Sequence, residues 1–151
     1  MSAQQQLLAK YGPPDHDHIV KYCSTWHIQQ DFPWFPAPAF LINNDFKALL
    51  YKAFKALEAA GLHTEIKTYD GCYNDRPVRG SDVASLHSWG VAIDMNAATN
   101  PMIPNAENLT PQQRLGAWSQ AFVDTMKSVG IFFGGDFHHR ADSMHWGLYD
   151  G

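Results

Sequence analysis

Two short segments that lie far apart in the chain carry the side chains that most constrain its fold. Residues 85–94 read SLHSWGVAID and hold His87 and Asp94, and residues 142–145 read DSMH and hold Asp142 and His145. Two imidazoles and one carboxylate leave one position of a tetrahedral zinc ion open, which is how catalytic rather than structural zinc is bound. A fold that used this chemistry would have to bring the two segments together.

The spacing within the first segment favours a bend followed by a strand. His87 and Asp94 are too far apart for one turn of a helix, and Gly90 between them permits the chain to turn. The alternation of a strand could then direct Asp94 toward His87, and His145 on a neighbouring strand would close the site. The spacing alone also allows a surface histidine, a turn aspartate and a core histidine. If His145 binds metal, the end of the chain must be docked into a sheet.

The full pattern, S-x-H-x-x-G-x-A-x-D followed by D-x-x-H-W, resembles the LAS-type zinc metallopeptidases. These are the D-alanyl-D-alanine carboxypeptidases and L-alanyl-D-glutamate endopeptidases, which include VanY-like enzymes and many phage endolysins. The resemblance runs from about Phe40 to the C-terminus and implies the hedgehog/DD-peptidase fold. It also implies that His87, Asp94 and His145 bind one zinc ion per chain and that Asp142 is the catalytic base.

The residue at position 142 separates two branches of that family. The vancomycin-resistance dipeptidase branch has glutamate at this place, whereas Asp142 resembles the phage and L-alanyl-D-glutamate branch. A carboxylate here suits a base for water activated by a metal. The alternative is a solvated turn carboxylate beside Arg140.

Five further residues are candidates for contact with substrate or for support of the site. The family uses an arginine upstream of the first zinc-binding histidine, which here is His87. Arg76 and Arg79 both qualify. We favour Arg76 because it lies closer to the end of the strand predicted at 64–69. A guanidinium suits an oxyanion that develops opposite zinc. Either arginine could instead pair with a nearby aspartate. We expect Ser85 to support the site through a hydrogen bond, and His138 and His139 to line the cleft.

These observations predict a zinc-dependent peptidoglycan hydrolase that cleaves the stem peptide of the bacterial cell wall. We expect an L-alanyl-D-glutamate endopeptidase that acts as a bacteriolytic phage endolysin, with a D-alanyl-D-alanine carboxypeptidase as the alternative. A non-catalytic zinc-binding module or a virion structural module is the alternative of another class. The combination of Asp142 with an upstream arginine argues against the non-catalytic module.

Composition limits the partners and the route to the substrate. The net charge of −4 gives no general attraction to nucleic acid or to anionic membranes. No apolar stretch approaches the length of a membrane span, and residues 1–10 lack the basic start and long apolar run of a secretory signal. We therefore expect a monomer made in the host cytoplasm that reaches the wall after release, by a holin-type route. Cys23 and Cys72 are expected to be reduced thiols.

The order of predicted elements favours a single α+β domain over residues 1–151, with an antiparallel sheet and helices packed on one side. Residues 1–40 are predicted to form an irregular arm rich in proline and aromatic residues, packed on a catalytic core of residues 41–151. Within the core we expect helices from Asp45 to Gly61 and from Thr110 to Gly130. Strands are expected at 64–69, 89–95 and 144–149.

Overall fold

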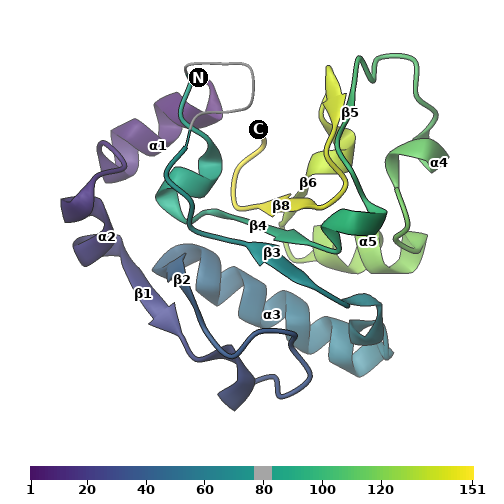
Figure 1. Cartoon of the computed structure of the whole chain (residues 1–151), viewed down its shortest axis with the longest axis horizontal. Helices are drawn as coiled ribbons and strands as arrows, with labels where there is room; N and C mark the ends of the chain where they lie inside the picture. The colour runs from purple at the N-terminus through teal and green to yellow at the C-terminus, as the bar shows by residue number, and fades with distance from the viewer. Residues whose placement is uncertain (77–82) are drawn as a thin grey trace.

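The computed structural model describes residues 1–76 and 83–151, and it shows an α+β fold (Figure 1). The helices are α1 (Ala3–Tyr11), α2 (His16–Tyr22), α3 (Asn44–Ala60), α4 (Pro111–Arg114) and α5 (Gln120–Ser128). The strands are β1 (Cys23–Trp26), β2 (Phe40–Asn43), β3 (Tyr69–Gly71), β4 (Ala92–Met95), β5 (Ile103–Pro104), β6 (Phe132–Phe133), β7 (Arg140–Ala141) and β8 (His145–Gly147). Short 3-10 helices are η1 (Ile28–Gln30), η2 (His63–Glu65), η3 (Leu86–Trp89), η4 (Ala97–Thr99) and η5 (Gly134–Asp136).

The central sheet has four strands in the order β3-β4-β8-β6, and each neighbouring pair is antiparallel. Strand β8 lies between β4 and β6, so the segment that carries His145 has a partner on both sides. In the register of β4 with β8, Ile93 is opposite Trp146 and Asp94 is opposite His145. Two smaller antiparallel pairs, β1 with β2 and β5 with β7, lie outside this sheet.

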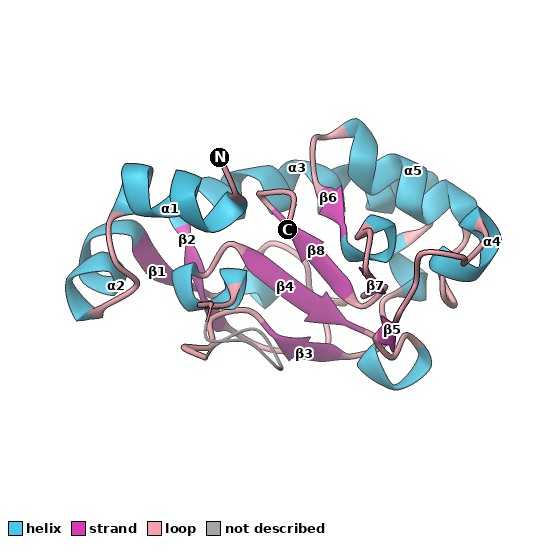
Figure 2. Ribbon diagram, turned by 90° about the horizontal axis from the view of Figure 1, so that it is seen from above, coloured by secondary structure: helices cyan, strands magenta, loops and turns pink. Residues whose placement is uncertain are grey.

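The two faces of the central sheet differ because side chains alternate along its strands. Ile93, Met95 and Trp146 belong to the main hydrophobic core, which also includes residues of α3 and α5. Figure 2 shows both helices along one side of the sheet, as the sequence predicted. Asp94 and His145, which alternate with these core residues, therefore lie on the opposite face.

Helix α3 forms much as its sequence indicates. The side chain of the buried Asn43 caps its first turn by accepting hydrogen bonds from the backbone N–H groups of Asp45 and Phe46. Phe46, Leu50, Ala53, Phe54 and Leu57 recur at helical spacing and are completely buried. Burial of each large apolar side chain stabilises the fold by roughly 1.5–3 kcal/mol. Gly61 ends the helix in the left-handed conformation, with φ of 70°.

The prediction of an irregular arm over residues 1–40 is wrong for its first part. The side chains of Ser2 and Asp15 cap two helices, α1 and α2, and strand β1 follows. The prolines at 13 and 14 fall between the helices, where they break neither. Leu7 and Tyr11 pack in a second hydrophobic cluster that includes residues of η3 and β4. Helix α1 thus covers part of the sheet face that carries Asp94.

The remainder of that segment, residues 31–39, has no helix or strand, as predicted. Its aromatic rings nevertheless pack closely against α3. The centroids of Phe32 and Phe35 both lie 5.7 Å from that of Phe54, and Trp34 donates a hydrogen bond from Nε1 to Glu58 at 2.7 Å. The prolines exclude regular structure while the rings provide the burial.

Two further predictions are corrected by the structure. Residues 64–69 do not form a strand, because the chain makes the 3-10 helix η2 and pairs with β4 only from Tyr69. The expected helix from Thr110 to Gly130 is two helices, α4 and α5. Gly116 has a φ of 64° between them, and Ser119 caps the second helix. In residues 1–76 and 83–151, no helix has the length and apolar character needed to cross a bilayer.

Candidate metal centre and active site

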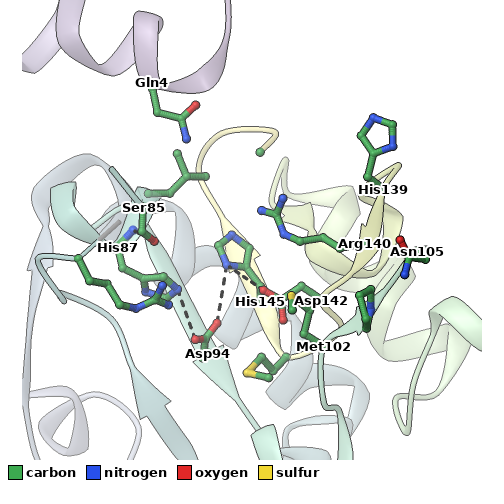
Figure 3. Close-up of a pocket in the computed structure, with 15 residues that line it drawn as sticks. Gln4, Ser85, His87, Asp94, Met102, Asn105, His139, Arg140, Asp142 and His145 are labelled. Carbon is green, nitrogen blue, oxygen red and sulfur yellow. Dashed lines mark hydrogen bonds and ion pairs between the residues drawn. The ribbon is translucent and has the colours of Figure 1, made fainter. Parts of the chain in front are cut away.

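His87 is held in place by the local structure of η3. Ser85 precedes this 3-10 helix, and its hydroxyl accepts a hydrogen bond from the backbone N–H of His87 at 3.3 Å. Gly90 ends the helix with φ of 68°, in the left-handed region that favours glycine. The ring atom Nδ1 of His87 lies 2.8 Å from the carbonyl oxygen of Cys72, so that this nitrogen carries the proton. The second ring nitrogen, Nε2, is left without a proton and faces Asp94 at 3.3 Å (Figure 3).

Asp94 and His145 are brought together by the register of β4 with β8. His145 Nδ1 lies 3.7 Å from Asp94 Oδ1, and the second oxygen of Asp94 faces His87. One ligand atom from each of His87, Asp94 and His145 lies within 4.8 Å of the others. The structure therefore assembles the three residues that the sequence pattern selected, and their donor set of two imidazoles and a carboxylate is typical of zinc.

The hydrogen bonding of this cluster also fits a metal ion. Among the described residues, His87 Nε2, Asp94 Oδ1 and His145 Nε2 are buried and have no hydrogen-bond partner. A buried polar atom without a partner costs roughly 1–3 kcal/mol. Each of the three candidate ligands has such an atom, and coordination of a cation by the cluster would offset that cost.

Glycine at position 134 leaves room for His145. A Cβ atom added to Gly134 would overlap the carbonyl oxygen of Asp142 and lie 2.7 Å from the Cβ of His145. A side chain at position 134 would therefore displace the segment that joins these two residues. The glycine allows η5 to pack directly against the strand that carries His145.

The charges of the cluster are strongly coupled. Burial lowers the pKa of His87, but its close contact with Asp94 and the negative charge of that carboxylate together outweigh this effect, so that the pKa is raised. Burial raises the pKa of Asp94, but the close contact with His87 and the positive charges around the carboxylate together outweigh burial, so that the net shift is downward. Burial, followed by the charge of His87, lowers the pKa of His145 to about 3. His145 is therefore neutral at physiological pH, which is the form that binds metals.

Asp142 lies beside this cluster. Its Oδ2 is 3.9 Å from Nδ1 of His145, and its Oδ1 has no hydrogen-bond partner among the described residues. Burial, followed by the negative charge of Asp94, raises the pKa of Asp142 to about 6. A carboxylate with a pKa near neutrality can both accept and return a proton at physiological pH. The position and the pKa together suit a general base.

A pocket of about 320 Å³ opens over these four residues. It is lined by Gln4, Arg76, Ser85, Leu86, His87, Asp94, Met102, Pro104, Asn105, His139, Arg140, Asp142, Met144, His145 and Gly151. The pocket thus combines both segments of the sequence pattern with Arg76 and with residues of α1, β5 and β7. Figure 3 shows its polar side chains on opposite walls around the histidine–aspartate cluster.

The other candidate residues divide between those at the pocket and those away from it. Arg76 and His139 line the pocket, and His139 also lies 3.0 Å from Glu107. His138 does not line the pocket; it is exposed and stacks edge-on against His139, with ring centroids 4.5 Å apart. Arg79 lies outside the described residues.

Gln4 and Arg140 are among the pocket residues that the sequence pattern did not indicate. Gln4 reaches the pocket from α1, a helix that was not expected. Arg140 lies two residues before Asp142 on β7, and its side chain extends toward the pocket in Figure 3. The only indication of Arg140 in the sequence was its position two residues before Asp142, because alternate residues of an extended chain point to the same side.

A comparison with protein families found a match. Residues 79–148 match the family model described as D-alanyl-D-alanine carboxypeptidase. That range is slightly less than half of the chain, and it includes His87, Asp94, Asp142 and His145. The match supports a peptidase of this family. The comparisons with curated proteins and with solved structures found no match.

Proposed function

We propose that the protein is a zinc-dependent peptidase that hydrolyses the stem peptide of bacterial peptidoglycan. The observation that carries the proposal is the position of Asp142 beside the cluster of His87, Asp94 and His145 in one pocket. The family match over the same residues supports peptide hydrolysis. A structural zinc site would need no additional half-buried carboxylate next to its ligands.

The roles of the side chains follow from their positions. His87, Asp94 and His145 would hold the zinc ion, which when bound polarises a scissile carbonyl and lowers the pKa of water. Asp142 accepts the proton of the attacking water and returns it to the nitrogen of the leaving amine. Arg76, whose positive charge lowers the pKa values of His87 and Asp94, would stabilise the oxyanion of the tetrahedral intermediate.

Two bonds of the stem peptide are candidates for cleavage. We place the L-alanyl-D-glutamate bond first, because aspartate rather than glutamate at position 142 resembles the phage endolysins of the family. The D-alanyl-D-alanine bond is the second candidate, and the description of the matching family favours it. The endopeptidase would act as a lytic enzyme that a phage delivers to the wall from the host cytoplasm through a holin-type route.

Digestion of purified peptidoglycan by the zinc-loaded protein tests the proposal. Mass spectrometry of the products should show new amino termini at D-glutamate for the endopeptidase, or loss of terminal D-alanine for the carboxypeptidase. Asp142→Asn is the matched control, since it keeps the size of the side chain and removes the base. If the wild-type protein binds zinc but releases no fragment from walls or from soluble muropeptides, the protein is a non-catalytic zinc module and the proposal is wrong.

A further inference from the structure

Arg140 is a cation on the wall of the pocket that the proposed chemistry does not use. It lies on β7, where Pro104 of β5 is its partner across the pair, and it is half-buried. Its guanidinium carbon lies 4.7 Å from the centroid of the Phe137 ring, and this ring also contacts His145, with centroids 5.2 Å apart. Stacking on Phe137 therefore fixes Arg140 close to a candidate zinc ligand.

Arg140 differs from the other arginine of this region in its partners. Arg114 donates hydrogen bonds to the backbone carbonyls of Ala106, Gly135, Phe137 and His138, so its role is to join these loops. Among the residues that the structure describes, none accepts a hydrogen bond from the Arg140 side chain or forms an ion pair with it, and the guanidinium packs on the ring of Phe137. A guanidinium fixed in a pocket with its donors unused is suited to bind a carboxylate of a ligand.

The position of Arg140 relative to Asp142 indicates which part of a substrate it meets. Asp142 must lie near the leaving nitrogen, because it returns the proton to that atom. Arg140 precedes Asp142 by two residues, and both side chains line the same pocket. It therefore lies on the side of the pocket that receives the residue whose amino group is released.

We propose that Arg140 binds a free α-carboxylate on the residue that follows the scissile bond. This inference rests on the proposed function and names a feature of its substrate. Both candidate bonds supply that chemistry. A terminal D-alanine carries its own carboxylate, and a D-glutamate joined to the next residue through its side chain keeps a free α-carboxylate. The two groups lie at the same distance along the chain from the scissile nitrogen.

The test compares matched pairs of synthetic peptides. One pair contains the L-alanyl-D-glutamate bond, with the α-carboxylate of the glutamate either free or converted to the carboxamide. The other pair contains the D-alanyl-D-alanine bond, with a free or an amidated terminus. For the pair that the protein cleaves, the ratio of kcat/KM for the carboxylate peptide to that for the carboxamide peptide should be about ten or more. The identity of the cleaved pair shows which of the two carboxylates Arg140 binds.

Variants of the protein show whether Arg140 is the source of this preference. Arg140→Gln should reduce the ratio to about one, and Arg140→Lys should keep part of it because the charge remains while the forked geometry is lost. Lys52→Gln, which removes a positive charge from the exposed surface of α3, should leave the ratio as in the wild type. Circular dichroism and zinc content should be the same in all variants, since Arg140 is not a ligand.

The outcomes separate the two proposals. A preference for carboxylate that persists in Arg140→Gln would overturn the role of Arg140, as would equal cleavage of both members of a pair by the wild type. Either result would leave the peptidase assignment intact. Failure of the zinc-loaded wild type to cleave all four peptides and purified peptidoglycan would overturn both proposals.

Discussion

The carbonyl oxygen of Cys72 accepts a hydrogen bond from Nδ1 of His87 at 2.8 Å. This one bond decides which nitrogen of the imidazole carries the proton, and so it directs the lone pair of Nε2 toward Asp94 and the pocket. Cys72 follows β3 directly, at the edge of the central sheet. The first candidate ligand is therefore oriented by the sheet, although its own backbone belongs to a 3-10 helix.

Replacement of His87 should remove the metal. His87→Ala deletes one of three protein ligands, so zinc affinity should fall by more than the roughly 10–100-fold that follows loss of an outer hydrogen-bond partner. The increase in melting temperature on addition of zinc should disappear with it. Inductively coupled plasma mass spectrometry and calorimetry measure the two effects. His27→Ala, at an exposed position, is the control, and one zinc ion retained in His87→Ala would contradict the assignment.

Ionisation of Asp142 should destabilise the metal-free protein at neutral pH. Burial and the charge of Asp94 raise its pKa to about 6, above the value near 3.9 of an unfolded chain. The stability that this group contributes is present below the unfolded pKa and is lost as the pH rises through about 6. Asp142→Asn should therefore stabilise the metal-free protein by on the order of 2 kcal/mol at pH 7.5, with no such gain at pH 3.5.

Urea unfolding in the presence of a chelator measures this difference. Asp124→Asn, on the exposed surface of α5, is the matched control and should show little change at either pH. An equal gain from Asp142→Asn at both pH values would mean that the effect does not arise from ionisation. The same variant, when loaded with zinc, should lose hydrolytic activity because the base is absent.

A side chain at position 134 should disturb the metal site. Gly134→Ala places a methyl group against Asp142 and His145, and we expect a loss of stability of about 1–3 kcal/mol together with weaker zinc binding. Gly135→Ala is a matched control, because its methyl group would overlap the carbonyl of Arg114 and the ring of Phe133 instead. Both variants should lower the melting temperature. Zinc titrations that show the same affinity in the two variants would refute a specific role for Gly134.

Substitution of Arg76 should slow catalysis more than it weakens binding of metal or substrate. If this arginine stabilises the oxyanion, Arg76→Gln should reduce kcat by roughly 100-fold or more while KM changes much less. Arg79→Gln provides the comparison, since both arginines precede the first histidine. A larger decrease in kcat for Arg79→Gln than for Arg76→Gln would reverse the assignment. Zinc content should be unchanged in both.

The sequence was sufficient to predict that His87, Asp94 and His145 lie together, because these residues occur in a short, regular pattern. Gly90 allowed a bend and strand alternation aligned Asp94, and the register of β4 with β8 then placed His145 opposite it. The antiparallel sheet and helix α3 were predictable for similar reasons, since local periodicity and caps determine them. These features depend either on contacts between residues close in the sequence or on the regular register of neighbouring strands.

The missed features depend on contacts between distant segments. The carbonyl of Cys72 is a backbone group, so no side-chain pattern indicates that it orients His87. Arg140 is recognisable only when the fold shows that its guanidinium faces the pocket and stacks on Phe137. Helix α1 was overlooked because three glutamines precede its only two leucines, and the burial of Leu7 depends on η3 and β4.

The position of β8 between β4 and β6 has a consequence for how the protein acquires its activity. During synthesis from the N-terminus, β4 and β6 emerge before the strand that must be inserted between them, and they have no pairing with each other. A growing chain therefore holds two of the three candidate ligands, His87 and Asp94, without the third. Insertion of a central strand is a late, long-range event that requires the rest of the sheet to be in place. Because of this strand order, the three candidate ligands come together only after β8 has been inserted between β4 and β6.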